Sequence, residues 1–223
     1  VYIQITSNGW TLDVPIRFWL RRKDQISIVN IVPGIQKENH AMKFKRITSA
    51  DDPLYTEAIQ LYESSFPFYE RREEASQRKV LPHPLYHFDA VCDQGQFIGE
   101  ILYWEFEEFR YIEHFCILPS MRNQQYGKRI LAALQEKPRI LEIDLPIDDL
   151  SKRRKGFYER CGFVENPYRH IQIPYHKGDS DHELVVMSSP RALAREEYDT
   201  FLKKLQLVVM ADMLFVLPWS AGV

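Results

Sequence analysis

The sequence predicts an α/β fold in which a mixed β-sheet carries helices on its faces. Segments of strand length and segments of helical period follow one another in the order β-α-α-β-β-β-α-β-α-β-β. Asp93-Gln94-Gly95 separates two apolar runs and predicts a hairpin. Gly162 follows a helical run and suits the left-handed position at which helices end.

The first predicted strand opens at Met42 and alternates polar and apolar residues through Ile47. Ser49 to Asp52 offer N-cap residues for a helix through Tyr62, and the charged segment from Glu70 to Lys79 predicts a second helix. The remaining elements are apolar runs bounded by turn residues: strands at 88–92, 96–103, 111–118, 139–144, 169–173 and 183–187, and helices at 125–136 and 149–161.

Residues 1–41 differ from the rest of the chain because they show no sustained hydrophobic period. Just before Met42, Lys37-Glu38 can be encoded by AAGGAG, a bacterial ribosome-binding sequence, so we interpret residues 1–41 as a translated leader. The alternative is a genuine extension with a hairpin at Asn8-Gly9. The domain itself is expected at 42–206, followed by an apolar tail at 207–223.

Composition argues against several classes of partner. The formal net charge of −2 gives no bias toward nucleic acid or an anionic membrane, and Asp212 interrupts the longest apolar stretch. The three cysteines are too widely spaced for a disulfide framework or a zinc site: Cys92, Cys116 and Cys161. We therefore expect a cytoplasmic protein with reduced thiols, no metal, and neither nucleic acid nor membrane as partner.

The strongest local signal is the turn Arg122-Asn123-Gln124-Gln125-Tyr126-Gly127, which lies between an apolar strand and an amphipathic helix. Free backbone N–H groups and the helix dipole make such a turn a binding site for anions. Arg122 and Lys128 add positive charge, so a pyrophosphate fits there. On this segment alone, an ordinary polar turn is an equal alternative.

The wider segment from Ile117 to Leu131 resembles the acetyl-CoA-binding motif of the Gcn5-related N-acetyltransferases (GNAT), a strand and Pro followed by [RQ]-x-x-G-x-[GA] and a helix. About thirty residues later, Phe157-Tyr158-Glu159-Arg160-Cys161-Gly162-Phe163 resembles the family's second signature. The resemblance covers residues 42–206 and is similar to a bacterial subgroup of unassigned substrate. It implies the acyl-CoA N-acyltransferase fold, a splayed central sheet flanked by helices.

This resemblance also implies where the co-substrate acetyl-CoA binds. The cofactor lies between two diverging strands, here 113–118 and 139–144. Its pantetheine pairs with the main chain of Cys116, Ile117 and Leu118, and its pyrophosphate binds at Arg122, Asn123, Gln124, Gln125, Tyr126, Gly127 and Lys128. Gln125 replaces the family's first loop glycine, which predicts weaker binding. Binding is not expected to be lost, because Gln125 can still offer its N–H if its dihedral angles are ordinary.

Tyr158 occupies the family's position for the acid that protonates the leaving thiolate, and we expect its pKa to be lowered in place. The alternative is an aromatic core residue. Glu113 is the candidate base, with acidic neighbours at 105, 107 and 108; it could instead be solvated or paired with Arg110, and Glu142 competes for the role. His114 is expected on the opposite face from Glu113 in a structural role, and Cys116 as a small buried residue.

Four residues are expected to bind the acceptor: Phe66, Glu70, Trp104 and Glu142. For the aromatic residues Phe66, Phe68, Tyr69 and Trp104, lining the acceptor pocket and packing the core are equal alternatives. The implied function is transfer of an acetyl group from acetyl-CoA to a primary amine, by direct attack in a ternary complex. The amine belongs to a small molecule or a peptide, and a homodimer is left open. The rival hypothesis is a catalytically silent acetyl-CoA-binding module that acts as a sensor or assembly domain.

Overall fold

The computed structural model describes residues 2–7, 10–15, 42–179 and 182–211. The chain divides into two compact units, Val1–His40 and Ala41–Val223, which are described separately. None of the helices in the described ranges has the length and apolar character that a membrane crossing requires.

In the first unit, strands β1 (Tyr2–Ser7) and β2 (Trp10–Pro15) pair antiparallel, with Ser7 opposite Trp10. This pairing fits the hairpin that was the alternative to a leader. The connecting residues Asn8 and Gly9 lie outside the described ranges, and the leader itself stays a prediction.

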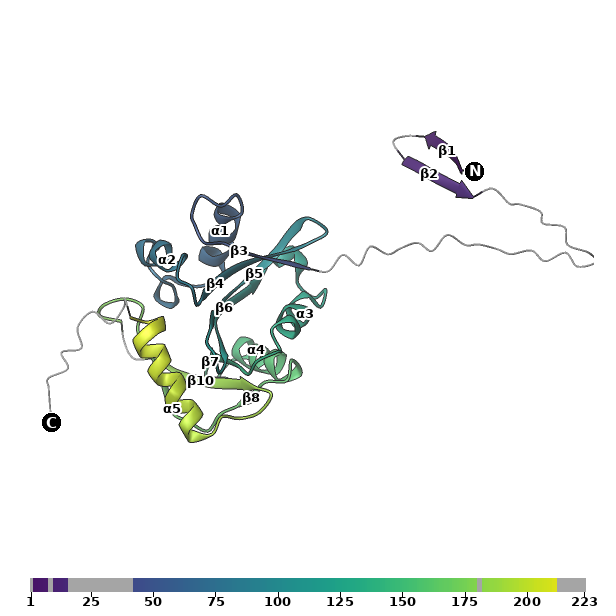
Figure 1. The fold of residues 1–223 in the computed structure, drawn as a ribbon. Coiled ribbons are helices and arrows are strands. Elements are labelled where there is room, and N and C mark those ends of the chain that lie inside the picture. Colours follow the sequence, from purple (N-terminus) through teal and green to yellow (C-terminus); the bar gives the residue numbers. More distant parts are fainter. Residues whose placement is uncertain (1, 8–9, 16–41, 180–181, 212–223) are drawn as a thin grey trace, which may run out of the picture. The chain divides into compact units, whose positions relative to one another are not determined.

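The second unit holds one mixed sheet in the order β3-β4-β5-β6-β7-β10-β8, with β9 paired to β10 (Figure 1). Among the described strands, only β6 and β7 are parallel neighbours. The strands are β3 Lys43–Arg46, β4 Tyr86–Asp93, β5 Gln96–Glu105, β6 Arg110–Ile117, β7 Arg139–Asp144, β8 Val164–Glu165, β9 His170–Gln172 and β10 His182–Ser189.

Helices cover both faces of this sheet, as predicted. One apolar cluster joins the sheet to α1, α2 and α5, and a second joins it to α3 and α4 (Figure 1). The helices are α1 Tyr55–Ser65, α2 Glu74–Val80, α3 Tyr126–Ala133, α4 Asp149–Arg160 and α5 Arg195–Lys204, with short helical turns η1 Phe68–Glu70, η2 Pro119–Met121 and η3 Leu205–Val209.

Two local predictions are confirmed by backbone geometry. Asp93 pairs with Gln96, and the intervening Gln94 and Gly95 both have positive φ, the conformation of a tight hairpin turn. Gly162 has φ +86°, the left-handed value expected after α4.

The C-terminal end of the domain differs from the prediction. The strand and helix pattern missed α5, whose Tyr198 and Phe201 are buried against the sheet. The apolar residues Val209 and Met210 are also buried in the same cluster, so the packed domain continues past the predicted boundary at 206. The remainder of the predicted tail, 212–223, lies outside the described residues.

The parallel pair β6–β7 separates along its length. The strands pair only over Arg110–Ile112 and Arg139–Leu141, although both continue further. On its other edge, β6 has a bulge, because Leu102 of β5 pairs with His114 while Tyr103 pairs with Ile112. Glu113 is the extra residue of this bulge, and the predicted splay begins there.

Candidate active site

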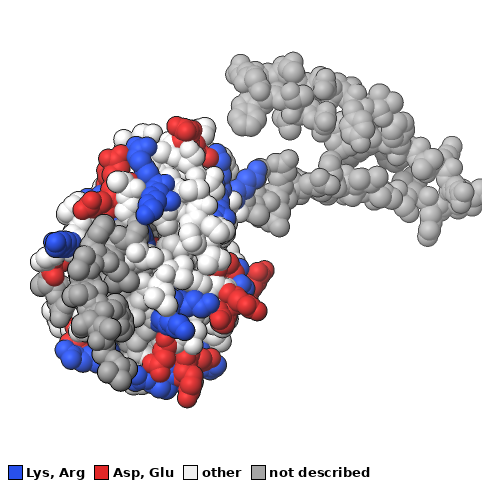
Figure 2. All heavy atoms as spheres, turned by 60° about the vertical axis from the view of Figure 1, so that its left-hand side comes forward, with Lys and Arg blue, Asp and Glu red and all other residues white. Residues whose placement is uncertain are grey.

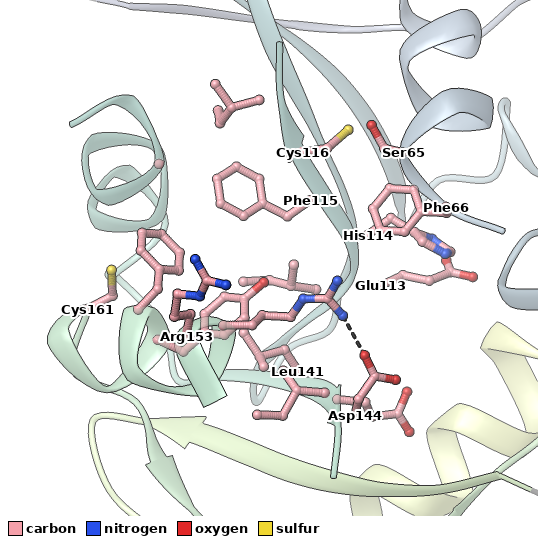
Figure 3. Close-up of a pocket in the computed structure, with 18 of the residues that line it drawn as sticks. Ser65, Phe66, Glu113, His114, Phe115, Cys116, Leu141, Asp144, Arg153 and Cys161 are labelled. Atoms are coloured by element: carbon pink, nitrogen blue, oxygen red, sulfur yellow. Dashed lines mark hydrogen bonds and ion pairs between the residues drawn. The ribbon is translucent and has the colours of Figure 1, made fainter. Parts of the chain in front are cut away.

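A cavity of about 850 Å³ opens where β6 and β7 separate. Its walls come from the end of α1 and the segment after it, β6, the loop before α3, β7, α4 and the β9–β10 region (Figure 3). Thirteen predicted site residues line it: Phe66, Glu70, Glu113, Cys116, Ile117, Arg122, Asn123, Gln125, Tyr126, Gly127, Lys128, Glu142 and Tyr158. Leu118, Gln124 and Trp104 were also predicted, but they are not among its lining residues.

The loop before α3 has the backbone of an anion site. Asn123 has φ +63° and Gln125 has φ +66°, so two left-handed residues stand just before the helix. Conformations of this kind turn backbone N–H groups into a concave nest for anions. Gln125 therefore does not meet the condition of ordinary dihedral angles, because this position keeps the left-handed backbone that glycine favours.

Gly127 has a different structural role from the one predicted. A Cβ added there would lie 3.0 Å from the Phe157 ring of α4 and 3.7 Å from the ring of Phe115. The absence of a side chain at Gly127 therefore allows α3 to pack closely against α4 and β6. Any effect of a larger side chain on phosphate binding would come in addition to this packing clash.

The open edge of β6 carries only part of the predicted main-chain set. The Cys116 carbonyl lies 2.5 Å from the position of a Cβ on Gly99, and Leu118 N–H donates to the Ile98 carbonyl at 3.0 Å, so both residues turn their main chain toward β5. Because main-chain direction alternates along a strand, Phe115 and Ile117 face the splay. The sequence did not identify Phe115, because the direction in which each main-chain group points depends on the pairing of β6 with β5.

Arg122 and Gln124 are held by main-chain carbonyl groups. Arg122 Nε donates to the Ile117 carbonyl at 3.2 Å, at the open edge of β6. Gln124 Nε2 donates to the Ser120 carbonyl at 3.0 Å. These hydrogen bonds fix the conformation of the loop. The side chain of Gln124 therefore has a structural role.

Tyr158 is half-buried beside the cavity, where its ring packs edge-on against Phe157 and Phe163. Partial burial raises the pKa of Tyr158 to about 12, and the nearby Arg154 opposes this change. The predicted lowering of its pKa is therefore wrong in direction. Tyr158 keeps its proton at neutral pH and can donate a hydrogen bond into the cavity.

The structure gives Glu113 a place that does not suit a base. Its side chain has no exposed surface and forms an ion pair with Arg72 at 3.0 Å. Trp104 Nε1 donates to it at 2.8 Å and the hydroxyl of Tyr175 at 3.0 Å. All these donors occupy the carboxylate, so an acceptor amine cannot reach it. The alternative pairing of Glu113 with Arg110 is not formed, because Arg110 pairs with Glu105.

Trp104 belongs to the same buried cluster, so its predicted contact with the acceptor is not supported. The indole is 1% exposed and packs on Tyr86, with centroids 5.1 Å apart. Arg72 also donates to the Val209 carbonyl at 2.6 Å, which ties the C-terminal turn to the sheet. The cluster of Arg72, Trp104, Glu113 and Tyr175 therefore stabilises the fold beneath the cavity and leaves Trp104 out of the acceptor wall.

The bulge also overturns the expected alternation between Glu113 and His114. His114 lies on the same side of β6 as Glu113, since both contact Tyr175. Figure 3 shows His114 and Cys116 on the side of Phe66 and Ser65, with Phe115 on the other. His114 Nε2 donates to the Glu70 carbonyl at 2.8 Å, and burial lowers its pKa, which agrees with the predicted structural role.

Cys116 has the properties of a small buried residue. Burial raises the pKa of its thiol, and its Sγ donates to Glu100 at 3.3 Å. Cys92, Cys116 and Cys161 are all free thiols, as the sequence predicted.

Glu142 is the carboxylate that remains at the splay. It lines the cavity, contacts Nε2 of His170 and accepts a hydrogen bond from the hydroxyl of Tyr111. His170 is 1% exposed, and its Nδ1 lies 3.0 Å from the hydroxyl of Tyr198. Sequence inspection missed His170 because 28 residues separate it from Glu142 and no motif links them.

The two ends of the cavity differ in charge. Arg122, Lys128, Arg153 and Arg160 line the end near α3 and α4, whereas Glu70, Glu142 and Asp144 line the other. Arg154 and Asp144 form an ion pair at 2.6 Å between them, the dashed line in Figure 3.

Glu70 is the carboxylate most affected by this environment. Burial and then the neighbouring Asp144 raise the pKa of Glu70, while Arg154 and His182 oppose the change. The predicted acidic set at 105, 107 and 108 is replaced by these residues, because Glu105 pairs with Lys137 and Glu108 with Lys204. Outside the cavity, charges of both signs are interspersed on the face shown in Figure 2.

Comparison with known proteins fits this geometry. The model of the acetyltransferase (GNAT) domain matches residues 85–165. A GNAT-family protein from Bacteroides thetaiotaomicron, named as an acetyltransferase, is 34% identical, with a TM-score of 0.70; the match covers 75% of this chain and 97% of that one.

Two more distant solved structures are the ribosomal-protein-S18-alanine N-acetyltransferase from Escherichia coli and an aminoglycoside 6'-N-acetyltransferase complexed with coenzyme A. The first is 16% identical, covers 70% of this chain and 97% of its own, and has a TM-score of 0.47. The second is 16% identical, covers 66% and 96%, and has a TM-score of 0.49. A comparison with curated proteins finds no match. Because the Bacteroides protein is 34% identical over almost its whole length, this chain belongs to the GNAT family and is an acetyl-CoA-dependent N-acyltransferase.

Proposed function

We propose that this protein transfers the acetyl group of acetyl-CoA to a primary amine by direct attack in a ternary complex. One observation carries the proposal: a single cavity joins a cationic end beside α3 to an anionic end at Glu70, Glu142 and Asp144. The first end suits the phosphates of coenzyme A and the second suits an ammonium group.

The co-substrate would bind along the loop and the open strand edge. Backbone N–H groups around Asn123 and Gln125, at the start of α3, would bind the pyrophosphate, with charge from Arg122 and Lys128. The pantetheine would pair with the main chain of Phe115 and Ile117. Its thioester would then lie at the splay, between Tyr158 and Glu142.

Glu142 is the proposed base in place of Glu113. An alkylammonium has a reference pKa of about 10.4, so it must lose a proton before it attacks. Glu142 lines the cavity and would take that proton, directly or through one water. His170 is the proposed positioning residue, because its contact with one carboxylate oxygen fixes the orientation of Glu142.

The amine nitrogen then bonds to the thioester carbon and loses its second proton to solvent, and the carbon–sulfur bond breaks to release the thiolate. A phenol with a pKa of about 12 is a weaker acid than an alkyl thiol near 8.5 by about 3 to 4 pKa units, equivalent to about 5 kcal/mol. Tyr158 would therefore stabilise the thiolate by a hydrogen bond and keep its proton. The thiolate would take its proton from solvent, leaving an amide and coenzyme A.

Release of thiol from acetyl-CoA with a panel of primary amines tests the reaction. Glu142→Gln is expected to lower kcat at neutral pH on the order of a hundredfold, with partial recovery as rising pH supplies neutral amine. His170→Gln should change the same pH profile by a smaller factor. Glu74→Gln is the matched control, since this glutamate is 68% exposed on α2.

Acetyl-CoA binding without thiol release for any amine would contradict the proposal and favour a silent binding module. An unchanged pH–rate profile in Glu142→Gln would remove this residue from the mechanism and make Glu70 the next candidate base to test.

A further inference from the structure

Exposed apolar side chains are concentrated in two short segments. Among the described residues, seven large hydrophobic side chains are prominently exposed: Phe68, Tyr69, Leu145, Ile147, Leu150, Val164 and Leu207. Five of them belong to the segments 68–69 and 145–150, with exposures of 60% for Phe68, 78% for Ile147 and 64% for Leu150. Exposed apolar residues that gather in this way mark binding surfaces.

Both segments border the anionic end of the cavity. Tyr69 precedes Glu70, and Leu145 follows Asp144; Glu70 and Asp144 both line the cavity, as does Leu150. We define the apolar rim as Phe68, Tyr69, Leu145, Ile147 and Leu150: Leu150 lines the cavity, and each of the other four lies within three residues of a lining residue.

The part of the rim contributed by η1 is held in place. The ring of His176 stacks on Phe68 with centroids 4.0 Å apart, and its Nε2 donates to the Phe68 carbonyl at 2.8 Å. His114 binds the Glu70 carbonyl at the other end of this turn. Two histidines thus fix the backbone that presents the exposed rings, so little ordering remains when a ligand binds.

An apolar rim above an anionic interior selects for one kind of amine. We propose that the acceptor is a primary amine joined by a short alkyl stem to an apolar body about the size of an aromatic ring. This inference rests on the proposed function, because it names the acceptor class of the same cavity. A polyamine fits poorly, since its second ammonium would lose water against apolar side chains.

The test compares amines that differ only in the apolar body. Thiol release is measured with 2-phenylethylamine, ethylamine and spermidine, and binding of each amine to the coenzyme A-loaded protein is measured by calorimetry. We expect kcat/KM for 2-phenylethylamine to exceed that for ethylamine at least tenfold. Phe68→Ser and Ile147→Ser should each lower it about fivefold to tenfold while leaving ethylamine unchanged.

Leu207→Ser is the matched control, because Leu207 is 61% exposed but lies in η3, outside the rim. Equal or better use of ethylamine or spermidine would overturn the inference while the transferase proposal stands. The inference would also be overturned if Phe68→Ser and Ile147→Ser lowered kcat/KM equally for 2-phenylethylamine and ethylamine, or if Leu207→Ser lowered kcat/KM for 2-phenylethylamine as much as they do. Absence of thiol release with every amine would instead overturn the proposed function and this inference with it.

Discussion

Replacing Glu113 by Gln separates a structural carboxylate from a catalytic one. The side chains of Glu113 and Arg72 are both fully buried, 3.0 Å apart. The glutamine keeps the shape but removes the negative charge. It also places an amide N–H₂ opposite either Arg72 or the Trp104 indole N–H, which now donates at 2.8 Å.

The expected loss of stability follows from these contacts. Removing one partner of a buried ion pair costs about 3 to 5 kcal/mol. The Val209 carbonyl still accepts from Arg72, which favours the lower half of this range. Since a whole domain is stable by about 5 to 15 kcal/mol, Glu113→Gln should be folded but clearly weakened.

Urea denaturation followed by tryptophan fluorescence and circular dichroism measures this loss. With a slope of about 2 kcal/mol per molar urea, the midpoint should fall by roughly 1.5 to 2 M. Glu74→Gln is the control, since it breaks a Glu–Arg pair whose side chains are 68% and 51% exposed. That change should cost less than about 1 kcal/mol.

The pH–rate profiles of Glu113→Gln and Glu142→Gln then distinguish the structural carboxylate from the catalytic one. Under conditions where Glu113→Gln is folded, its pH–rate profile should keep the parent's shape, whereas that of Glu142→Gln should not. The reasoning fails if Glu113→Gln keeps the parent's urea midpoint and loses activity that returns at high pH. That result would restore Glu113 as the base.

Four further predictions concern the cofactor side and the N-terminal segment. Tyr158→Phe should slow transfer about tenfold to a hundredfold, because a charge-assisted hydrogen bond to the thiolate is lost; since burial raises its pKa to about 12, no descending limb from Tyr158 should appear below about pH 10 in a pH–rate profile. Gln125→Gly should raise the free energy of unfolding by up to about 1 kcal/mol, and with it the melting temperature, because glycine adopts φ +66° without strain. It should bind acetyl-CoA at least as tightly in calorimetry; weaker binding would implicate the glutamine side chain. Gly127→Ala should lose roughly 1 to 3 kcal/mol, because its Cβ would lie 3.0 Å from Phe157; an unchanged melting temperature with lost binding would instead indicate a clash with the cofactor. Deleting residues 1–41 should leave acetyl-CoA affinity unchanged, because the whole mixed sheet lies in the unit 41–223; a protein that binds more weakly or melts earlier would assign this segment a structural role.

Several features could be predicted because they depend on neighbouring residues. The hairpin at Gln94-Gly95 and the stop at Gly162 follow from glycine and turn chemistry. The succession of strands and helices around the loop before α3 follows from hydrophobic period, which identified most elements of the sheet. α5 was missed because its apolar positions are few and its buried face became apparent only against β6 and β9.

The sequence by itself therefore determined the element order, the turn before α3, the Tyr158 signature and the family resemblance that connects them. Only the tertiary structure decided which partner each carboxylate at the cavity has. Glu113 is neutralised by Arg72, 41 residues earlier, and a bulge sets its direction; Glu142 meets His170, 28 residues later. Local periodicity carries no information on such partners, because burial and charge pairing depend on which distant segments the sheet brings together.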